Sequence, residues 1–131
     1  MPAWKYYEKE DKYFEDKPLY HVPILSHGRA DVFIESICDK YNLPYPKISY
    51  KGRKFHSCGR KEDRITFCDG WITLGILCHE MAHHYTKHKL GHMKHNDELF
   101  SITKKLLNYI NNYVMDEKDR LGVKHSYNSC D

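Results

Sequence analysis

The chain has 131 residues, 40% of them hydrophobic and 30% charged, and a formal net charge of +3. This length and composition predict a single folded domain over residues 1–131. No segment approaches the roughly 18 apolar residues of a membrane span, and residues 1–16 lack the apolar segment of a secretory signal. We therefore expect a cytoplasmic protein without a membrane partner. The near balance of charges gives no support to a nucleic-acid partner.

The N-terminal third is predicted to hold an aromatic extension and a helix. Residues 1–20 carry six aromatic side chains among many charged ones, without a clear period. We expect this extension to be ordered, because so many exposed aromatic rings would promote aggregation. Whether it covers a functional site as a lid is left open. Residues 29–41 predict a helix from the three- and four-residue spacing of Phe33, Ile34 and Ile37. Pro44 ends it, because the residue before a proline avoids helical geometry.

The middle of the chain predicts a small antiparallel sheet. Strand-like segments at residues 48–50 and 55–57 flank a turn at Gly52. A third strand is expected at residues 64–68, after a polar loop at residues 59–63. Such strands support an α+β fold when helices follow them.

Two further helices are predicted after the strands. Residues 71–88 carry apolar side chains on more than one helical face, which is typical of a helix in the middle of a fold. Asp69 is the expected N-cap, and Gly91 the expected left-handed stop. Asn96 then caps a final helix, and residues 118–131 are expected to form a loose tail. The apolar face of that final helix consists of Leu99, Ile102, Leu106, Ile110 and Tyr113.

His79-Glu80-Met81-Ala82-His83 is an H-E-x-x-H motif. On a helix, positions i and i+4 point the same way, so both imidazoles can reach one tetrahedral zinc ion. Glu80 follows the first ligand, and its carboxylate can act as the general base toward water and return the proton to the leaving amine. The pattern predicts one zinc ion per chain, with His79 and His83 as ligands and Glu80 as the catalytic residue. A chance motif in a His-rich, metal-free helical protein is the competing interpretation.

The third ligand must come from the segment after the motif. His84 points about 100° away from His83 and is a poor co-ligand. His95 is favoured, because the chain can return to the metal after the turn at Gly91. His92 and Glu98 remain alternatives, the latter because a Glu on a later helix can complete such a site.

The five cysteines are odd in number and contain no C-x-x-C pair. We expect reduced thiols, as in the cytosol. The alternative is that Cys58 and Cys68 bind zinc, although structural zinc ligands normally come in closely spaced pairs.

Residues 75–84, which contain the motif, and residues 95–100, which begin His95-Asn96-Asp97-Glu98, together resemble the SprT-like zinc metallopeptidases. The resemblance covers about residues 45–112. It implies a zincin-like minidomain with an N-terminal helix, a small β-meander at residues 51–69, a metal-binding helix and a C-terminal helix. It also implies that His95 is the third zinc ligand. The family's action on DNA-crosslinked proteins rests on additional DNA-binding parts and does not carry over.

The chemistry and the resemblance both predict a zinc-dependent hydrolase of peptide bonds in proteins or peptides. The alternative is a non-proteolytic zinc-binding module that grips a protein or nucleic acid. In zincins an extended substrate adds to an edge strand, for which residues 64–68 or 54–57 are candidates. A group must also stabilise the oxyanion. The available side chains are Tyr85, His92, Tyr113, His125 and Tyr127.

Overall fold

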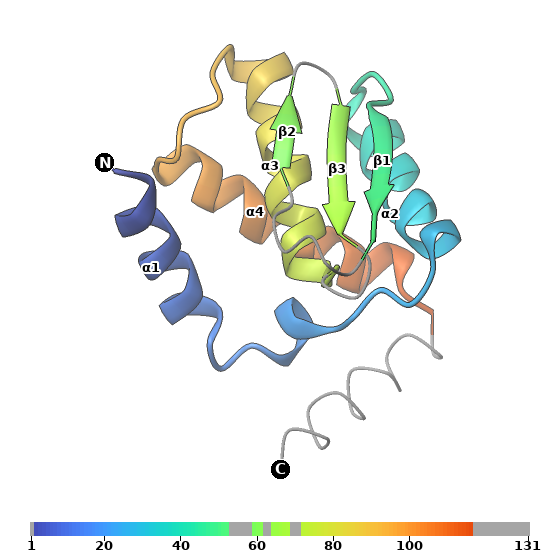
Figure 1. The fold of residues 1–131 in the computed structure, drawn as a ribbon, viewed down its shortest axis with the longest axis horizontal. Helices are drawn as coiled ribbons and strands as arrows, with labels where there is room; N and C mark the ends of the chain where they lie inside the picture. Colours follow the sequence, from blue (N-terminus) through green and yellow to red (C-terminus); the bar gives the residue numbers. More distant parts are fainter. Residues whose placement is uncertain (1, 53–58, 62–63, 69–71, 117–131) are drawn as a thin grey trace.

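The computed structural model describes residues 2–52, 59–61, 64–68 and 72–116, and the side chains of residues 59–61 are left out of the description. The fold mixes helices and strands: the three strands are consecutive in the chain, with helices before and after them (Figure 1). In chain order the elements are α1 (Ala3–Phe14), the 3-10 turn η1 (Pro18–His21), α2 (His27–Tyr41), β1 (Lys47–Lys51), β2 (Gly59–Lys61), β3 (Arg64–Cys68), α3 (Leu74–Leu90), α4 (Asp97–Tyr109) and the π-helical turn η2 (Ile110–Val114).

The three described strands form one sheet in the order β1-β3-β2. β1 runs parallel to β3, with Ile48 opposite Ile65, and β2 runs antiparallel to β3. The prediction of an antiparallel meander was therefore wrong, because it assumed that strands consecutive in sequence would pair. β1 skips β2 and pairs with the far edge of β3. Residues 64–68 are the central strand, so the prediction that they offer a substrate-binding edge was also wrong.

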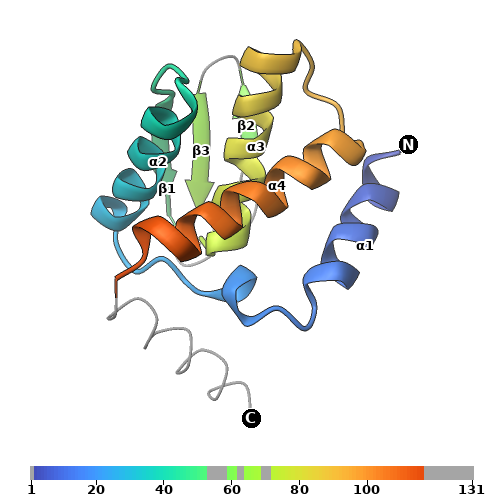
Figure 2. The ribbon, with the colours of Figure 1, turned by 180° about the vertical axis from the view of Figure 1, so that it is seen from behind.

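The predicted loop at residues 59–63 was wrong in part, because Gly59–Lys61 forms β2. The predicted strand at residues 55–57 and the candidate edge at residues 54–57 lie outside the described residues, as does the predicted loose tail at residues 118–131. Figure 2 shows α2 and α3 on the same face of the sheet, with α4 crossing α3 on the side away from the strands. α3 is thus the middle layer of the fold.

The predicted helix at residues 29–41 is confirmed, and it begins two residues earlier. The Ser26 hydroxyl accepts a hydrogen bond from the Arg29 N–H at 3.1 Å, which satisfies one amide of the first turn of α2. Asn42 ends the helix in the left-handed conformation, with φ of 55°. Phe33, Ile34 and the other predicted apolar positions up to Cys38 are buried.

α3 begins at Leu74 rather than at Trp71, because Thr73 is its N-cap. The Thr73 hydroxyl accepts from the Ile76 N–H at 3.2 Å. The predicted N-cap Asp69 lies outside the described residues. Gly91 stops the helix at φ of 76°, as predicted. Most residues of α3 are buried, and they lie on all faces of the helix. Apolar side chains on more than one face predicted this burial.

Asn96 caps α4 as predicted, and its side chain accepts from the Leu99 N–H at 3.1 Å. Leu99, Leu106 and Ile110 are buried on the predicted face. Tyr113 is 79% exposed, so its place on that face was wrong. The chain changes to π-helical bonding at Ile110, and this extra residue per turn rotates Tyr113 away from the core.

The N-terminal extension folds as helix α1, which the sequence did not predict. Tyr6, Glu10 and Phe14 recur every four residues and form its buried face. The helical period is hidden in the sequence, because a charged residue lies in the middle of this stripe and exposed rings lie outside it. The Phe14 ring stacks on Tyr20 of η1 at a centroid distance of 4.2 Å, so the extension is packed onto the domain as expected.

Within the described residues, no helix combines the length and the apolar character that crossing a bilayer requires.

Gly75 allows η1 to pack closely on α3. A Cβ atom at this position would lie 2.4 Å from a ring carbon of Tyr20. We therefore expect Gly75→Ala to lower the free energy of unfolding by about 1–3 kcal/mol, the usual cost of overpacking, although alanine is the better helix former. Urea denaturation measures the change. Gly28→Ala in α2 is the matched control, since its Cβ would meet only the Ser26 hydroxyl at 3.9 Å. A stabilised Gly75→Ala variant would contradict this packing.

Candidate metal centre

His79 and His83 lie one turn apart on the same face of α3. Their ring centroids are 4.9 Å apart, and each side chain is buried, with 5% of each residue exposed. This placement follows from the i, i+4 spacing on a helix that both neighbouring layers hold in place. The two predicted ligands of the motif are therefore brought together by α3 alone.

His95 enters the site from the connection between α3 and α4. Gly91 turns the chain back, and Asn96 starts α4, so His95 is held between two helix termini. The Nε2 atoms of His83 and His95 are 3.3 Å apart. His79, His83 and His95 each offer a ligand atom, and these atoms all lie within 4.8 Å of one another. Three imidazoles so placed could hold a metal ion.

The other two candidates for the third ligand are engaged with each other. The His92 Nε2 lies 3.0 Å from the Glu98 Oε1, and Glu98 is exposed. Neither belongs to the group of side chains that converge on the site in the described part of the chain. Of the three alternatives, His95 is the one that the fold brings to His79 and His83.

The hydrogen bonds of the His79 ring show whether the three histidines fit a metal ion. Its Nδ1 is engaged by Glu10, whereas its buried Nε2 has no hydrogen-bond partner among the described residues. A buried polar atom without a partner is costly, and metal coordination removes that cost. A set of three imidazole nitrogens suits zinc and neighbouring divalent ions. The donors thus fit a metal ion without specifying which one.

Glu80 is the next residue on α3 and is also buried, with 6% exposed. Its negative charge acts on both His79 and Tyr7, whose pKa values it helps to raise. It is not one of the three converging ligands. The structure therefore places the predicted general base beside the cluster and leaves the histidines to bind the ion.

Glu10 of α1 is a site residue that the sequence did not reveal. Its Oε1 lies 3.0 Å from the His79 Nδ1, and the Tyr20 hydroxyl donates to its Oε2 at 2.8 Å. Burial opposes ionisation of Glu10, but the hydrogen bonds from His79, Tyr20 and Tyr6 outweigh it, and its pKa is lowered. Burial likewise opposes protonation of His79, but the bond and charge of Glu10 raise the pKa of His79. One Glu in a highly charged segment gives no signal of this role.

Tyr7 is the second unexpected residue, on the same helix. Its hydroxyl lies 3.1 Å from the His95 Nε2, and its ring centroid is 5.4 Å from that of His79. Burial, followed by the charges of Glu80 and Glu10, raises its pKa above the usual value of 10.0. Tyr7 is therefore a protonated phenol at neutral pH and can donate a hydrogen bond into the site.

The predicted oxyanion groups lie elsewhere or outside the described residues. Tyr85 packs edge-on against Tyr41 at 5.6 Å, His92 pairs with Glu98, and Tyr113 is exposed on η2. His125 and Tyr127 are not among the described residues. All the predicted groups follow the motif in the chain, whereas the Tyr7 hydroxyl beside His95 comes from α1.

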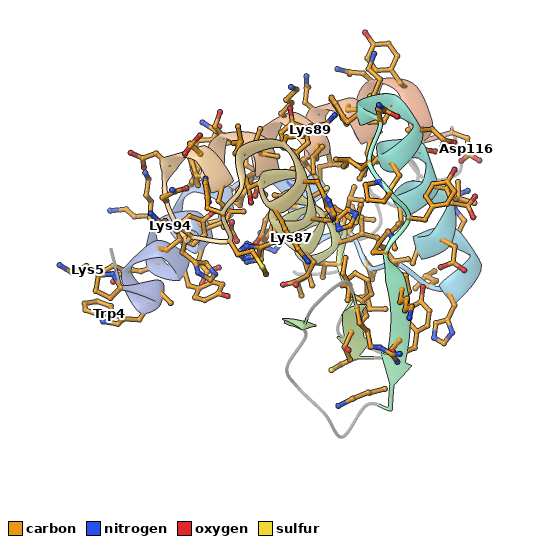
Figure 3. The ribbon with its side chains drawn as sticks, turned by 90° about the horizontal axis from the view of Figure 1, so that it is seen from above. Trp4, Lys5, Lys87, Lys89, Lys94 and Asp116 are labelled. Atoms are coloured by element: carbon orange, nitrogen blue, oxygen red, sulfur yellow. The ribbon has the colours of Figure 1, made fainter. Side chains whose placement is uncertain are left out.

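His84 is a core residue and is not among the converging ligands, in agreement with its predicted direction on the helix. It is 1% exposed, and its Nε2 lies 2.6 Å from the Pro44 carbonyl oxygen. His88, Lys89 and Lys94 are exposed around the end of α3, where Figure 3 labels the two lysines. The surplus histidines thus divide between the core and a solvated basic surface.

The described cysteines Cys38, Cys68 and Cys78 are buried, and Cys38 and Cys78 are free thiols. Burial raises the pKa of the Cys38 thiol to about 12, so it is neutral at physiological pH. Cys58 and Cys130 lie outside the described residues, and the alternative zinc pair of Cys58 and Cys68 stays a hypothesis.

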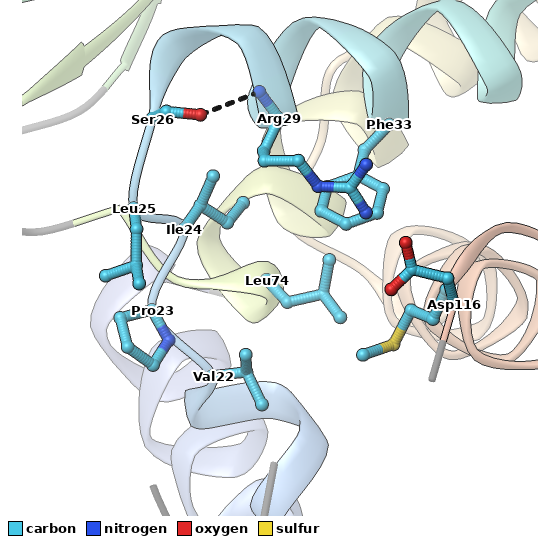
Figure 4. A pocket seen from close by; sticks show the side chains of 10 residues that line it. Val22, Pro23, Ile24, Leu25, Ser26, Arg29, Phe33, Leu74 and Asp116 are labelled. Carbon is cyan, nitrogen blue, oxygen red and sulfur yellow. Dashed lines mark hydrogen bonds between the residues drawn. The ribbon is translucent and has the colours of Figure 1, made fainter. Parts of the chain in front are cut away.

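A cavity of about 430 Å³ lies at the start of α2 and α3 (Figure 4). Its walls are mainly apolar, with Phe33 and Leu74 among them and Arg29 and Asp116 as charged members. It contains none of the three histidines. It is therefore a feature separate from the candidate metal centre.

Comparison with protein-family models, with curated proteins and with solved structures found no significant match.

We expect the chain, purified without chelators or a His tag, to bind about one metal ion per molecule. His79→Ala and His95→Ala should both lose the ion, because each removes one of three converging donors. His92→Ala, which removes a histidine outside the cluster, is the control and should retain it. Elemental analysis gives the stoichiometry. Loss of metal from His92→Ala but not from His95→Ala would reassign the third ligand.

Proposed function

We propose that this protein is a zinc-dependent metallopeptidase that hydrolyses peptide bonds in proteins or peptides. The observation that carries the proposal is the convergence of His95 on the two histidines of an H-E-x-x-H helix, with buried Glu80 beside them. Three protein ligands are typical of catalytic zinc sites, which keep one coordination position open, whereas structural sites usually use four. The resemblance of residues 75–84 and 95–100 to SprT-like metallopeptidases points the same way and stays a prediction.

Zinc at the three histidines would polarise the scissile carbonyl and make water more acidic. Glu80 accepts a proton from the attacking water while the oxygen of that water bonds to the carbonyl carbon. Glu80 then gives that proton to the amide nitrogen, the C–N bond breaks, and an amine and a carboxylic acid leave. A buried carboxylate next to the first ligand suits this proton transfer, because it is fixed in position and shielded from bulk water.

Tyr7 is the group that we propose to stabilise the oxyanion. Its hydroxyl lies at the cluster, 3.1 Å from the His95 Nε2, and is protonated at neutral pH. It can donate a hydrogen bond to a carbonyl oxygen that gains negative charge. This role makes α1 part of the active site.

The substrate would bind as an extended strand. β2 is the outer strand of the described sheet on the side of α1 and lies nearer to that helix than β1 or β3 does (Figure 1). Adding a substrate strand there would satisfy backbone groups along the edge and would place the peptide between the sheet and α1. This arrangement favours unfolded segments or flexible loops as substrates.

Glu80→Gln tests the proton transfer. We expect it to retain zinc and to lose activity by about 10²–10⁴-fold, the contribution of a general acid–base group. Cleavage of an unfolded protein such as casein, followed by mass spectrometry, measures the loss. Glu98→Gln changes an exposed carboxylate outside the cluster and should cleave like the parent. If Glu80→Gln cleaves as well as the parent, the mechanism is wrong; if the zinc-loaded parent cleaves nothing, the non-proteolytic module becomes the better interpretation.

Tyr7→Phe tests the oxyanion role. It should retain zinc and lower kcat by about 10²–10³-fold with little change in KM, because the lost hydrogen bond forms in the transition state. Tyr13→Phe is the control, since Tyr13 lies on the same helix and packs on Phe100 instead. An unchanged kcat for Tyr7→Phe would remove this residue from the mechanism.

A further inference from the structure

Glu10 is a buried carboxylate for which the proposed chemistry has no use. It is 2% exposed and lies in the middle of the face with which α1 packs on the domain. A buried ionised group destabilises a fold unless its oxygens are hydrogen-bonded. Both of its oxygens have donors, so the question is what this arrangement holds in place.

The three donors to Glu10 come from three different elements. The Tyr6 hydroxyl of α1 donates to Oε1 at 3.1 Å, and the Tyr20 hydroxyl of η1 donates to Oε2 at 2.8 Å. The third is the His79 Nδ1 of α3, which is 3.0 Å from Oε1. Two of these contacts fix the carboxylate, and the third fixes the imidazole.

The contact to His79 decides how that ring is used. A neutral imidazole carries one N–H, and an acceptor at Nδ1 keeps the proton there. The Nε2 lone pair then faces the cluster with His83 and His95. The Nε2 atom has no hydrogen-bond partner among the described residues, in keeping with this tautomer.

The packing of Tyr20 on Gly75 supports the contact between Glu10 and His79. Gly75 lies one turn before His79 on α3, and its missing side chain admits the Tyr20 ring. That ring carries the hydroxyl that holds the Glu10 Oε2. If Glu10 served only to attach α1 to the domain, its carboxylate would not need to contact the ring of His79, a proposed metal ligand.

We propose that Glu10 is a positioning residue of the metal site and that it couples metal binding to the docking of α1. It fixes the tautomer and orientation of His79, and a metal ion held by the Nε2 in turn strengthens the N–H bond to Glu10. Because such coupling is reciprocal, the ion must stabilise the docked helix as much as the docked helix stabilises the ion. The inference rests on the proposed metal site and is independent of peptidase activity.

Zinc affinity tests the positioning role. In competition with a chromophoric chelator, Glu10→Gln should bind zinc about 10–100-fold more weakly than the parent, the usual cost of removing such an outer partner. Glu8→Gln is the matched control, because Glu8 is an exposed carboxylate on the same helix. Equal affinity of Glu10→Gln and the parent would overturn this inference alone. Failure of the parent to bind zinc would overturn the metal site as well.

Hydrogen exchange of the unaltered chain tests the coupling, even where Glu10→Gln does not fold. Zinc should slow the exchange of the amides of residues 3–14, which lie outside the ligand segments. Unchanged exchange there, with zinc bound, would overturn the coupling. Nitrogen-15 NMR of the metal-free protein gives a further readout, since the neutral His79 ring should carry its proton on Nδ1; a neutral ring with its proton on Nε2 would overturn the positioning role.

Discussion

The two ring nitrogens of His79 have different roles, and most of the site depends on this difference. Nδ1 meets the carboxylate of Glu10, while the buried Nε2 has no hydrogen-bond partner among the described residues and is left to bind an ion together with His83 and His95. The first contact ties α1 to the middle of the fold, and the second defines a place for a cation. A single side chain thus connects the N-terminal helix, the buried helix α3 and the segment that begins α4.

The helix α3 could be predicted well because local signals agreed with one another. Its apolar residues on several faces indicated burial, and Gly91 marked its end. The sheet was predicted less well because strand order and direction are long-range properties. Strand-like segments predicted β1 and β3, but nothing local indicates that β1 skips β2 in the strand order and pairs in parallel with β3. α1 was missed because Glu10 interrupts its buried stripe.

The candidate site was predictable in proportion to how local its parts are. His79, Glu80 and His83 follow from a spacing of four on one helix, and His95 from a turn that lets the chain return. Glu10 and Tyr7 lie about 70 or more residues earlier in the chain, and they meet the histidines only because α1 packs on α3 and α4. Tertiary packing brings these outer partners to the site, so a single sequence gave no sign of them.

X-ray absorption at the zinc edge of the metal-loaded protein tests the central claim most directly, because it reports the ligands without an assay. We predict imidazole scattering from three histidines per zinc, with nitrogen at about 2.0–2.1 Å and no sulfur ligand. His95→Ala should remove one imidazole or the ion itself. Sulfur at about 2.3 Å, as cysteine ligands would give, or an unchanged spectrum in His95→Ala, would contradict a three-histidine centre.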